Sequence, residues 1–454
     1  MAVEITRTPS SNGNQKTWTF SVWLKGQDVT SGTAQNILSA LYGSSSRYAN
    51  INITSSYTLE VFSGVYSTGA STTTSAYLVT NRVFRDPSAW WNIVVAYDTT
   101  NATSGDRVKI YINGVRETSF STETYPSLND DSFFNVTTTQ NRIGASGGAN
   151  VYKGLMTHMH FIDGTAYDAS TFGETDATTG IWKPKTAPSV TYGTNGFFLK
   201  FENSANMDLD SSPNNLTFST SGTLTQTVDT PSNVFATLNP LIPIGAEFSN
   251  GNLTHSVTSG GYQTALTTLG ASSGKWYSEF KITTDTSYLG MGVGNLDKGN
   301  INAISYLGDS TNGVVLHPGA NGLYYNATNP SFTTGTTFAN GDIIGIALDI
   351  DNGFIYWHKN GTYMNSGVPT SGATGTGGFA VSNIANSDGT GTYAFGVTSS
   401  ATPGTRTITC NFGNGYFGTT PVSSAGSNGN GAIFEYDVPT GYYALNTQNL
   451  ATYG

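Results

Sequence analysis

The stretch from 341 to 363, GDIIGIALDIDNGFIYWHKNGTY, constrains the fold of this chain more than any other. Its apolar residues at 343–348 predict a mostly buried strand, and Asp-Ile-Asp-Asn-Gly at 349–353 predicts a turn. Residues 354–357 predict a returning strand that ends at Asn-Gly. Asn and Gly accept the positive φ angles of tight hairpin turns, and the flanking β-branched and aromatic residues favour strands. We therefore expect a β-hairpin.

The same design occurs once earlier in the chain. Residues 91–98, WNIVVAYD, are followed by a polar loop and then by 108–114, VKIYING. In both places a hydrophobic strand ends in Asp, and a second strand containing Ile-Tyr ends at Asn-Gly. This repetition predicts two β domains, each built around one such hairpin.

Composition supports an all-β chain. Helical periodicity is not sustained in any window, whereas alternating runs such as 18–24, WTFSVWL, recur between Gly, Ser, Thr and Asn clusters. A net charge of -10 and the lack of any Lys/Arg cluster argue against a nucleic-acid partner. The single cysteine, Cys410, excludes an intrachain disulfide, so we expect a small buried side chain there.

The N-terminus and the hydropathy of the chain bear on its location. Met1 leads into Val3-Glu4-Ile5 without a basic and apolar leader, and no apolar run approaches the length that spans a membrane. We therefore expect a soluble protein that is made in a cytoplasm and does not insert into a membrane.

Proline placement suggests the domain boundary. The segment 229–246 contains three prolines, Pro231, Pro240 and Pro243, which disfavour regular pairing and predict an extended linker. The predicted domains are thus 1–228 and 247–454, the second with a C-terminal extension. The Gly/Ser/Asn-rich tract 423–431 predicts a flexible surface loop or a short linker. The Tyr- and Asn-rich end, 442–453, is a candidate attachment segment.

Several of these motifs resemble known families. Residues 17–24, 91–98, 107–114 and 154–163 resemble the laminin-G-like, concanavalin A-like jelly roll, over roughly 1–220. Residues 274–280, GKWYSEF, with Gly292-Val293-Gly294, the 341–361 hairpin and Asn411-Phe412-Gly413, resemble the SPRY (B30.2) sandwich over about 250–420. These resemblances imply two concanavalin A-like antiparallel sandwiches in tandem.

The combination also resembles virion proteins of marine tailed phages. The segments that carry this resemblance are 7–11, 172–174 and 438–447. It implies a non-enzymatic, lectin-like protein of the tail or particle surface, with other virion proteins and copies of itself as partners and a host-surface polysaccharide as ligand. The alternative is a capsid decoration or tail-assembly subunit without a glycan ligand. A polysaccharide-degrading enzyme is the third possibility.

Loops at the ends of the two sandwiches are the expected ligand sites, because a rigid scaffold holds them in place. Aromatic rings beside Asn and Asp suit a sugar, although each ring taken alone is more often part of a packed core. The candidate glycan contacts are Tyr262, His317, Tyr324, Tyr325 and Trp357 in the second domain and Tyr66, Tyr125 and Trp182 in the first.

Acidic loops are candidate Ca²⁺ sites, since this ion prefers oxygen ligands. The candidates are Asp163, Asp168, Glu174 and Asp176, or Asp208 and Asp210; acidic turn and cap residues are the alternative reading. A glucanase of concanavalin type would need two facing carboxylates, as in Glu-x-Asp-x-x-Glu, and this triplet does not occur. Asp349 and Asp351 flank the hairpin turn, where Asp favours local hydrogen bonds. We therefore predict no catalytic residues.

Overall fold

The computed structural model describes residues 3–26, 32–42, 47–65, 73–241, 245–284, 287–298, 306–401 and 404–454. The all-β prediction is confirmed, with sheets that are almost entirely antiparallel. Among the described residues the α-helix is limited to α1 (Thr447–Tyr453). Short 3-10 turns occur at Ser104–Asp106, Ala169–Thr171, Pro318–Ala320, Met364–Ser366, Pro369–Thr374 and Val381–Asn383. The chain divides into two compact units, Met1–Gln226 and Thr227–Gly454.

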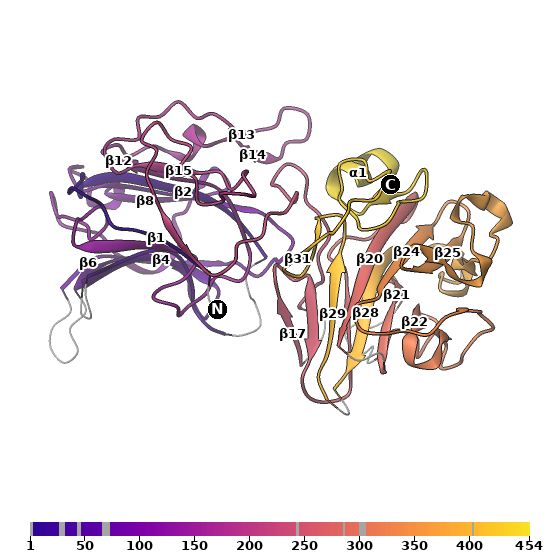
Figure 1. The fold of residues 1–454 in the computed structure, drawn as a ribbon. Coiled ribbons are helices and arrows are strands. Elements are labelled where there is room, and N and C mark those ends of the chain that lie inside the picture. The colour runs from indigo at the N-terminus through magenta and orange to yellow at the C-terminus, as the bar shows by residue number, and fades with distance from the viewer. Residues whose placement is uncertain are drawn as a thin grey trace. The chain divides into compact units, whose positions relative to one another are not determined.

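The first unit is a β-sandwich of two sheets (Figure 1). The eight-stranded sheet has the order β10 (Phe120–Thr124), β6 (Thr73–Val83), β5 (Thr58–Val65), β4 (Arg47–Ile53), β3 (Gln35–Tyr42), β11 (Thr139–Ile143), β1 (Glu4–Arg7), β16 (Ser219–Ser221). The six-stranded sheet has the order β15 (Phe197–Leu199), β12 (Leu155–Asp163), β2 (Thr17–Lys25), β7 (Trp91–Asp98), β8 (Val108–Ile112), β9 (Val115–Arg116). A separate ribbon pairs β13 (Gly173–Thr175) with β14 (Trp182–Pro184).

Strand alternation builds the core of this sandwich. In β2 the side chains of Trp18, Phe20, Val22 and Leu24 share one face and lie in the same buried cluster as residues of the eight-stranded sheet. The Trp18 ring stacks on Tyr97 of the neighbouring strand β7, with ring centroids 4.8 Å apart. The predicted hairpin of β7 and β8 is confirmed by their antiparallel pairing.

The second unit is also built from two main sheets. The larger has the order β17 (Ala246–Ser249), β18 (Thr254–Val257), β29 (Arg406–Asn411), β20 (Lys275–Thr284), β24 (Ile343–Asp349), β25 (Phe354–Lys359), β26 (Thr362–Tyr363), with β27 (Phe379–Ala380) on β25 and β32 (Tyr443–Ala444) parallel to β20. The five-stranded sheet has the order β19 (Tyr262–Leu266), β28 (Tyr393–Ser400), β21 (Leu289–Asn295), β22 (Gly313–His317), β23 (Gly322–Tyr325). A small ribbon pairs β30 (Tyr416–Phe417) with β31 (Thr420–Pro421).

The hairpin that opened the sequence analysis lies in the larger sheet, between β20 and β26. β24 and β25 pair in antiparallel register from Ile344 opposite Lys359 to Asp349 opposite Phe354. Gly353 adopts a φ of +81° in the turn, as a tight reversal requires. Ile344, Ile346, Leu348, Ile355 and Trp357 project into the core between the two sheets. The hairpin prediction is confirmed.

Two segments that we expected to be extended or free pack into the second unit. In the predicted linker 229–246, Phe235, Ala236 and Leu238 are buried, and Ala236 N–H donates to Leu445 C=O. In the predicted attachment segment Tyr442 is fully buried, and the rings of Tyr443 and Tyr453 stack 3.7 Å apart. Burial of the apolar side chains in both segments outweighs the local effect of proline and polar residues. Cys410 is buried as expected.

Candidate functional site

The outer face of the five-stranded sheet brings three predicted ligand residues together. In β22 and β23, Val314, Leu316 and Leu323 enter the core, so their neighbours face outward. His317 and Tyr324 are therefore on the outer face, and the register places Tyr324 opposite Val315. Tyr262 begins β19 at the far edge of the same sheet and lies in the same outer cluster.

These three residues line a pocket of about 230 Å³. We refer to it as the aromatic pocket; its other lining residues are Tyr306, Asp309, Ala320 and Asn329. Tyr306, which sequence reasoning missed, lies at its centre. The Tyr306 ring meets Tyr262 edge to face at 4.4 Å between centroids and Tyr324 at 5.0 Å. The pocket thus presents several aromatic rings in perpendicular arrangement.

Some polar groups of the aromatic pocket have hydrogen-bond partners and others do not. Tyr306 is 3% exposed, and its hydroxyl has no hydrogen-bond partner among the residues that the structure describes. Burial raises the pKa of Tyr306 far above its ordinary value, so the phenol is neutral. An unpaired buried hydroxyl of this kind costs roughly 1–3 kcal/mol of folding free energy. Its retention inside a pocket makes it a candidate ligand contact.

Two further groups define the electrostatics of the aromatic pocket. Partial burial raises the pKa of Asp309. A hydrogen bond from Tyr324 favours the carboxylate and lowers this pKa, but the effect of burial is larger. The His317 Nδ1 accepts a hydrogen bond from Ala320 N–H at 2.9 Å, and burial lowers the pKa of His317. The neutral imidazole therefore carries its proton on Nε2. The pocket combines hydroxyl and imidazole donors with one carboxylate acceptor.

The outer face of the larger sheet is also rich in tyrosine, but the chain covers it. Tyr277, Ala347 and Tyr356 are adjacent on β20, β24 and β25, and Phe434, Val438 and Tyr442 of the C-terminal segment pack over them. We call this the sealed face. All six residues are at most 1% exposed. The C-terminal extension is therefore an integral part of the second unit.

A directed hydrogen-bond chain lies beneath this cover. Gly361 N–H donates to Nδ1 of His358, so Nε2 of that ring carries the proton and donates to the Tyr277 hydroxyl at 2.6 Å. The Tyr277 hydroxyl donates to Glu279 at 3.1 Å. Glu279 also accepts from the N–H groups of Glu435 and Tyr436, each at 2.8 Å. The buried carboxylate thus anchors the C-terminal segment.

Gly345 makes this chain of contacts possible. It lies between Glu279 and His358 in the register of β20, β24 and β25. A Cβ at Gly345 would clash with Nε2 of His358.

Burial also changes the titration of the two ionisable groups in this chain of contacts. It lowers the pKa of His358 to about 3 and raises the pKa of Glu279 to about 7.

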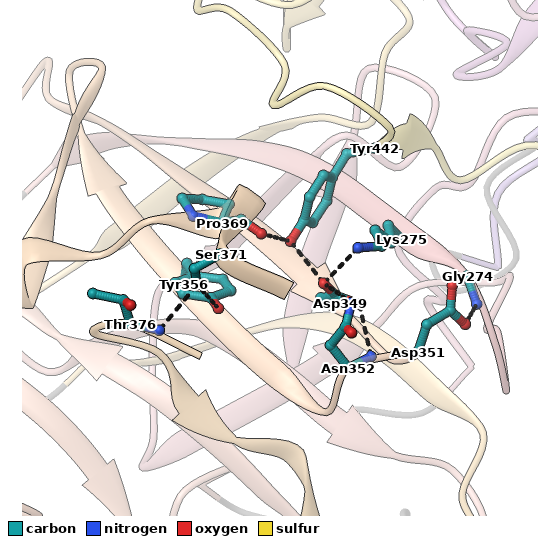
Figure 2. A network of polar contacts seen from close by, with 10 residues as sticks. All are labelled: Gly274, Lys275, Asp349, Asp351, Asn352, Tyr356, Pro369, Ser371, Thr376 and Tyr442. Carbon is teal, nitrogen blue, oxygen red and sulfur yellow. Dashed lines mark hydrogen bonds and ion pairs between the residues drawn. The ribbon is translucent and has the colours of Figure 1, made fainter. Parts of the chain in front are cut away.

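A second polar cluster of the sealed face centres on Asp349 (Figure 2). Its side chain is fully buried and accepts from Lys275 Nζ at 2.8 Å and from both nitrogens of Asn352. Tyr442 donates to Pro369 C=O at 2.9 Å and lies within 3.5 Å of Asp349. Asp351 accepts from Gly274 N–H. Both aspartates therefore have structural roles in the hairpin turn and its cover.

The strands that carry these features have a known relative. Residues 275–398 match the SPRY domain family. They form a SPRY domain. The match covers the hairpin, Glu279, His358 and most of the aromatic pocket, whereas Tyr262 precedes it and the C-terminal segment follows it.

Solved structures similar to the chain include two SPRY domains. One is the SPRY domain of human HERC1, which is 18% identical and has a TM-score of 0.30; the similarity covers 38% of this chain and 96% of the HERC1 domain. Another is the TRIM65 PSpry domain, which is 12% identical and has a TM-score of 0.29; the similarity covers 39% of this chain and 91% of the TRIM65 domain. Comparison with curated proteins gives no match.

Two predicted ligand residues of the second domain are placed elsewhere. Trp357 of the SPRY domain is fully buried and donates from Nε1 to Met291 C=O at 3.2 Å, so it is a core residue and not a ligand contact. Tyr325 faces the opposite side from Tyr324, because adjacent strand residues alternate, and its hydroxyl donates to Asn383 C=O. Neither residue lines the aromatic pocket.

The first unit holds the remaining predicted ligand residues. Tyr125 lines a separate open pocket of about 330 Å³ with Asp106, Arg116, Glu117 and Glu123 among its neighbours. Burial and a hydrogen bond to Glu123 raise the pKa of Tyr125 to about 12.

Trp182 lies away from that pocket. Its ring packs against Gly114 and Gly173, and its Nε1 donates to Asn92 at 3.0 Å. Trp182 is therefore a packing residue of the six-stranded sheet's outer face. Tyr66 lies outside the described residues.

The acidic Ca²⁺ candidates do not come together in a metal site. Asp163 accepts from Asn14 N–H, Asn135 and Asn195 N–H, and Asp210 from Phe198, Ser212 and Leu216 N–H. The others bond to nearby Ser, Thr or Lys groups; these are Asp168, Glu174, Asp176 and Asp208. Within the described ranges no group of three His, Cys, Asp or Glu side chains is arranged to hold a metal ion.

The described part of the chain contains no helix that is both long enough and apolar enough to cross a membrane.

Proposed function

We propose that this chain is a non-enzymatic surface protein of a tailed-bacteriophage virion that binds host-surface glycans. In this proposal the two units are tandem concanavalin A-like sandwiches, a laminin-G-like jelly roll followed by a SPRY-like sandwich. The observation that carries the proposal is the aromatic pocket, where Tyr262, Tyr306 and Tyr324 surround polar groups suited to hydroxyls. The phage assignment rests on the resemblance of segments 7–11, 172–174 and 438–447 to virion proteins.

The proposed mechanism is multivalent adhesion. A pocket of about 230 Å³ is below the range of about 300–1,000 Å³ typical of larger ligand sites, which favours a single sugar ring and weak binding. Many copies on one particle, associated with other virion proteins, would convert weak contacts into stable attachment.

The carboxylates favour binding over hydrolysis. Glycosidases use a pair of carboxyl groups across the scissile bond. The aromatic pocket is lined by one carboxylate, Asp309. In the pocket of the first unit, Asp106 pairs with Arg116, Glu117 with Arg82, and Glu123 accepts from Tyr125. Burial opposes ionisation of Glu117, but hydrogen bonds from Arg82 and two backbone N–H groups prevail and lower its pKa.

Binding to cells tests the proposal. The purified, fluorescently labelled chain is added to intact candidate host cells with and without competing surface polysaccharide, beside a Tyr262→Ala variant. We expect saturable, polysaccharide-competed binding that Tyr262→Ala weakens at least tenfold. If the wild-type chain does not bind even when multimerised on beads, the adhesion proposal fails. That result would favour the alternative, a capsid decoration or tail-assembly subunit.

A further inference from the structure

The hydroxyl of Tyr306 is buried, unpartnered and at the lining of a pocket. Its ring is held by Tyr262, Tyr324 and His317, all in edge contacts with centroids 4.4–6.0 Å away. A backbone hydrogen bond from Asp309 N–H to Tyr306 C=O, at 3.0 Å, closes a turn that places both residues at the pocket. The position of the hydroxyl is therefore set by the protein before any ligand binds.

Other unpartnered hydroxyls do not share this setting. Among the described residues the hydroxyl of Tyr363 is also buried without a partner, but Tyr363 lines neither of the two pockets. The Tyr306 hydroxyl is thus an unused hydrogen-bonding group of a residue that lines the aromatic pocket.

The chemistry around Tyr306 selects the kind of ligand. A phenol donates one hydrogen bond and accepts others, and the nearby Asp309 carboxylate accepts only. A sugar hydroxyl, which both donates and accepts, complements this pair. The pocket lining contains no Lys or Arg, and the chain carries a net charge of -10. An anionic sugar would meet repulsion from the Asp309 carboxylate inside the lining, while Arg406, which acts on Tyr262 electrostatically, lies outside the lining.

We infer that the aromatic pocket takes a neutral sugar ring, one hydroxyl of which hydrogen-bonds the Tyr306 phenol while the ring packs on Tyr262 or Tyr324. This inference rests on the proposed glycan-binding function and adds a specificity residue and a ligand class to it. The sugar carries no charge, so its binding should persist at high salt.

The test uses the full chain and saturation-transfer NMR titration. The probes are the methyl glycosides of glucose, galactose, mannose and N-acetylglucosamine, with methyl glucuronide as the anionic control. We expect at least one neutral glycoside to bind and the glucuronide not to. Tyr306→Phe, which removes only the hydroxyl, should weaken binding roughly 3- to 10-fold, the range for one lost neutral hydrogen bond. Tyr363→Phe is the matched control and should bind as wild type does.

Deoxy analogues of the bound glycoside identify a direct contact. The effect of Tyr306→Phe should disappear for the one analogue that lacks the bonded hydroxyl. Equal binding by wild type and Tyr306→Phe overturns the inference and leaves the proposed function standing. Polysaccharide-competed cell binding without any glycoside binding overturns it too, because the glycan contact then lies elsewhere. When neither cells nor glycosides bind, the proposed function fails together with the inference.

Discussion

The two outer faces of the second unit carry similar aromatic residues in opposite states. On the sealed face, Tyr277 and Tyr356 lie under Phe434 and Tyr442 of the chain's own C-terminal segment. On the face of the five-stranded sheet, Tyr262 and Tyr324 are half-buried and border an open pocket. The Tyr277 hydroxyl forms hydrogen bonds with both His358 and Glu279, whereas the Tyr306 hydroxyl has no partner in the described part of the chain.

This difference separates structural from available aromatic residues. A tyrosine whose hydroxyl and ring are both satisfied within the chain stabilises the fold and has nothing left to offer a ligand. One that is buried with an unpaired hydroxyl destabilises the fold slightly and keeps a free hydrogen-bonding group. Composition alone, which includes 25 tyrosines, does not distinguish the two.

The largest expected difference between the two faces is the stability lost when an aromatic ring is replaced by alanine. Phe434 of the C-terminal segment is 1% exposed. Phe434→Ala should lower the free energy of unfolding by about 3–5 kcal/mol, through lost burial and the cavity left behind. The control on the open face, Tyr262→Ala, should lower it by about 1–2 kcal/mol. Urea denaturation followed by tryptophan fluorescence measures both. Equal losses would mean that the C-terminal segment does not seal its face as tightly as described.

The next effect is a pH dependence specific to the sealed face. Burial raises the folded-state pKa of Glu279 to about 7, from 4.5 in the unfolded chain. Its contribution to stability is therefore complete below pH 4.5 and is lost as the pH rises through 7. Glu279→Gln removes this titration. The stability of wild type relative to Glu279→Gln should fall by up to about 3 kcal/mol between pH 5 and pH 8.

Urea denaturation of both proteins at each pH checks this expectation, and groups common to both cancel in the difference. A difference that is constant or grows with pH would contradict it. That outcome would mean that the hydrogen bonds from Tyr277, Glu435 and Tyr436 keep the carboxylate charged throughout.

The smallest expected effects come from removing one tyrosine hydroxyl on each face. The two removals should change the free energy of unfolding in opposite directions. Tyr277→Phe removes the buried partner of His358 Nε2 and one of the donors to Glu279, so it should lower the free energy of unfolding by about 1–3 kcal/mol. Tyr306→Phe removes an unpaired hydroxyl and should leave it unchanged or raise it by up to about 1 kcal/mol. Thermal and urea denaturation measure both variants. A clear loss for Tyr306→Phe would show that its hydroxyl has a structural partner.

The strands were predictable because their signals are local. The hairpins at 91–112 and 343–359 follow from alternating apolar residues and from turn residues that accept positive φ. The packing of 229–241 and of 434–446 was not predictable from the sequence, because neither segment has a strong strand pattern. Both are held in place by burial against β20, β24 and β25. The prolines in 229–246 predicted an extended linker but not where that segment packs.

The candidate site was predictable in part. His317 and Tyr324 were predicted as ligand contacts, but in loops at the ends of the sandwich; the structure places them on the outer face of β22 and β23. The sequence also did not say which of Tyr324 and Tyr325 faces outward. The same ambiguity led to Trp357, which is in the core while its neighbour Tyr356 faces the C-terminal segment. Tyr306 was missed because it lies in a turn without a strand pattern; the Tyr-x-x-Asp spacing of Tyr306 and Asp309 was the available signal.

The sequence by itself determined the all-β class, the two hairpins and the buried cysteine, because hydrophobic periodicity and turn chemistry act between near neighbours. Only the tertiary structure decided which aromatic residues are sealed and which are open. The ring of Tyr277 contacts Phe434 and the ring of Tyr262 contacts Tyr306 across long stretches of chain, and those contacts depend on how the sheets and the C-terminal segment pack. Whether a buried polar group finds a partner is a property of that packing.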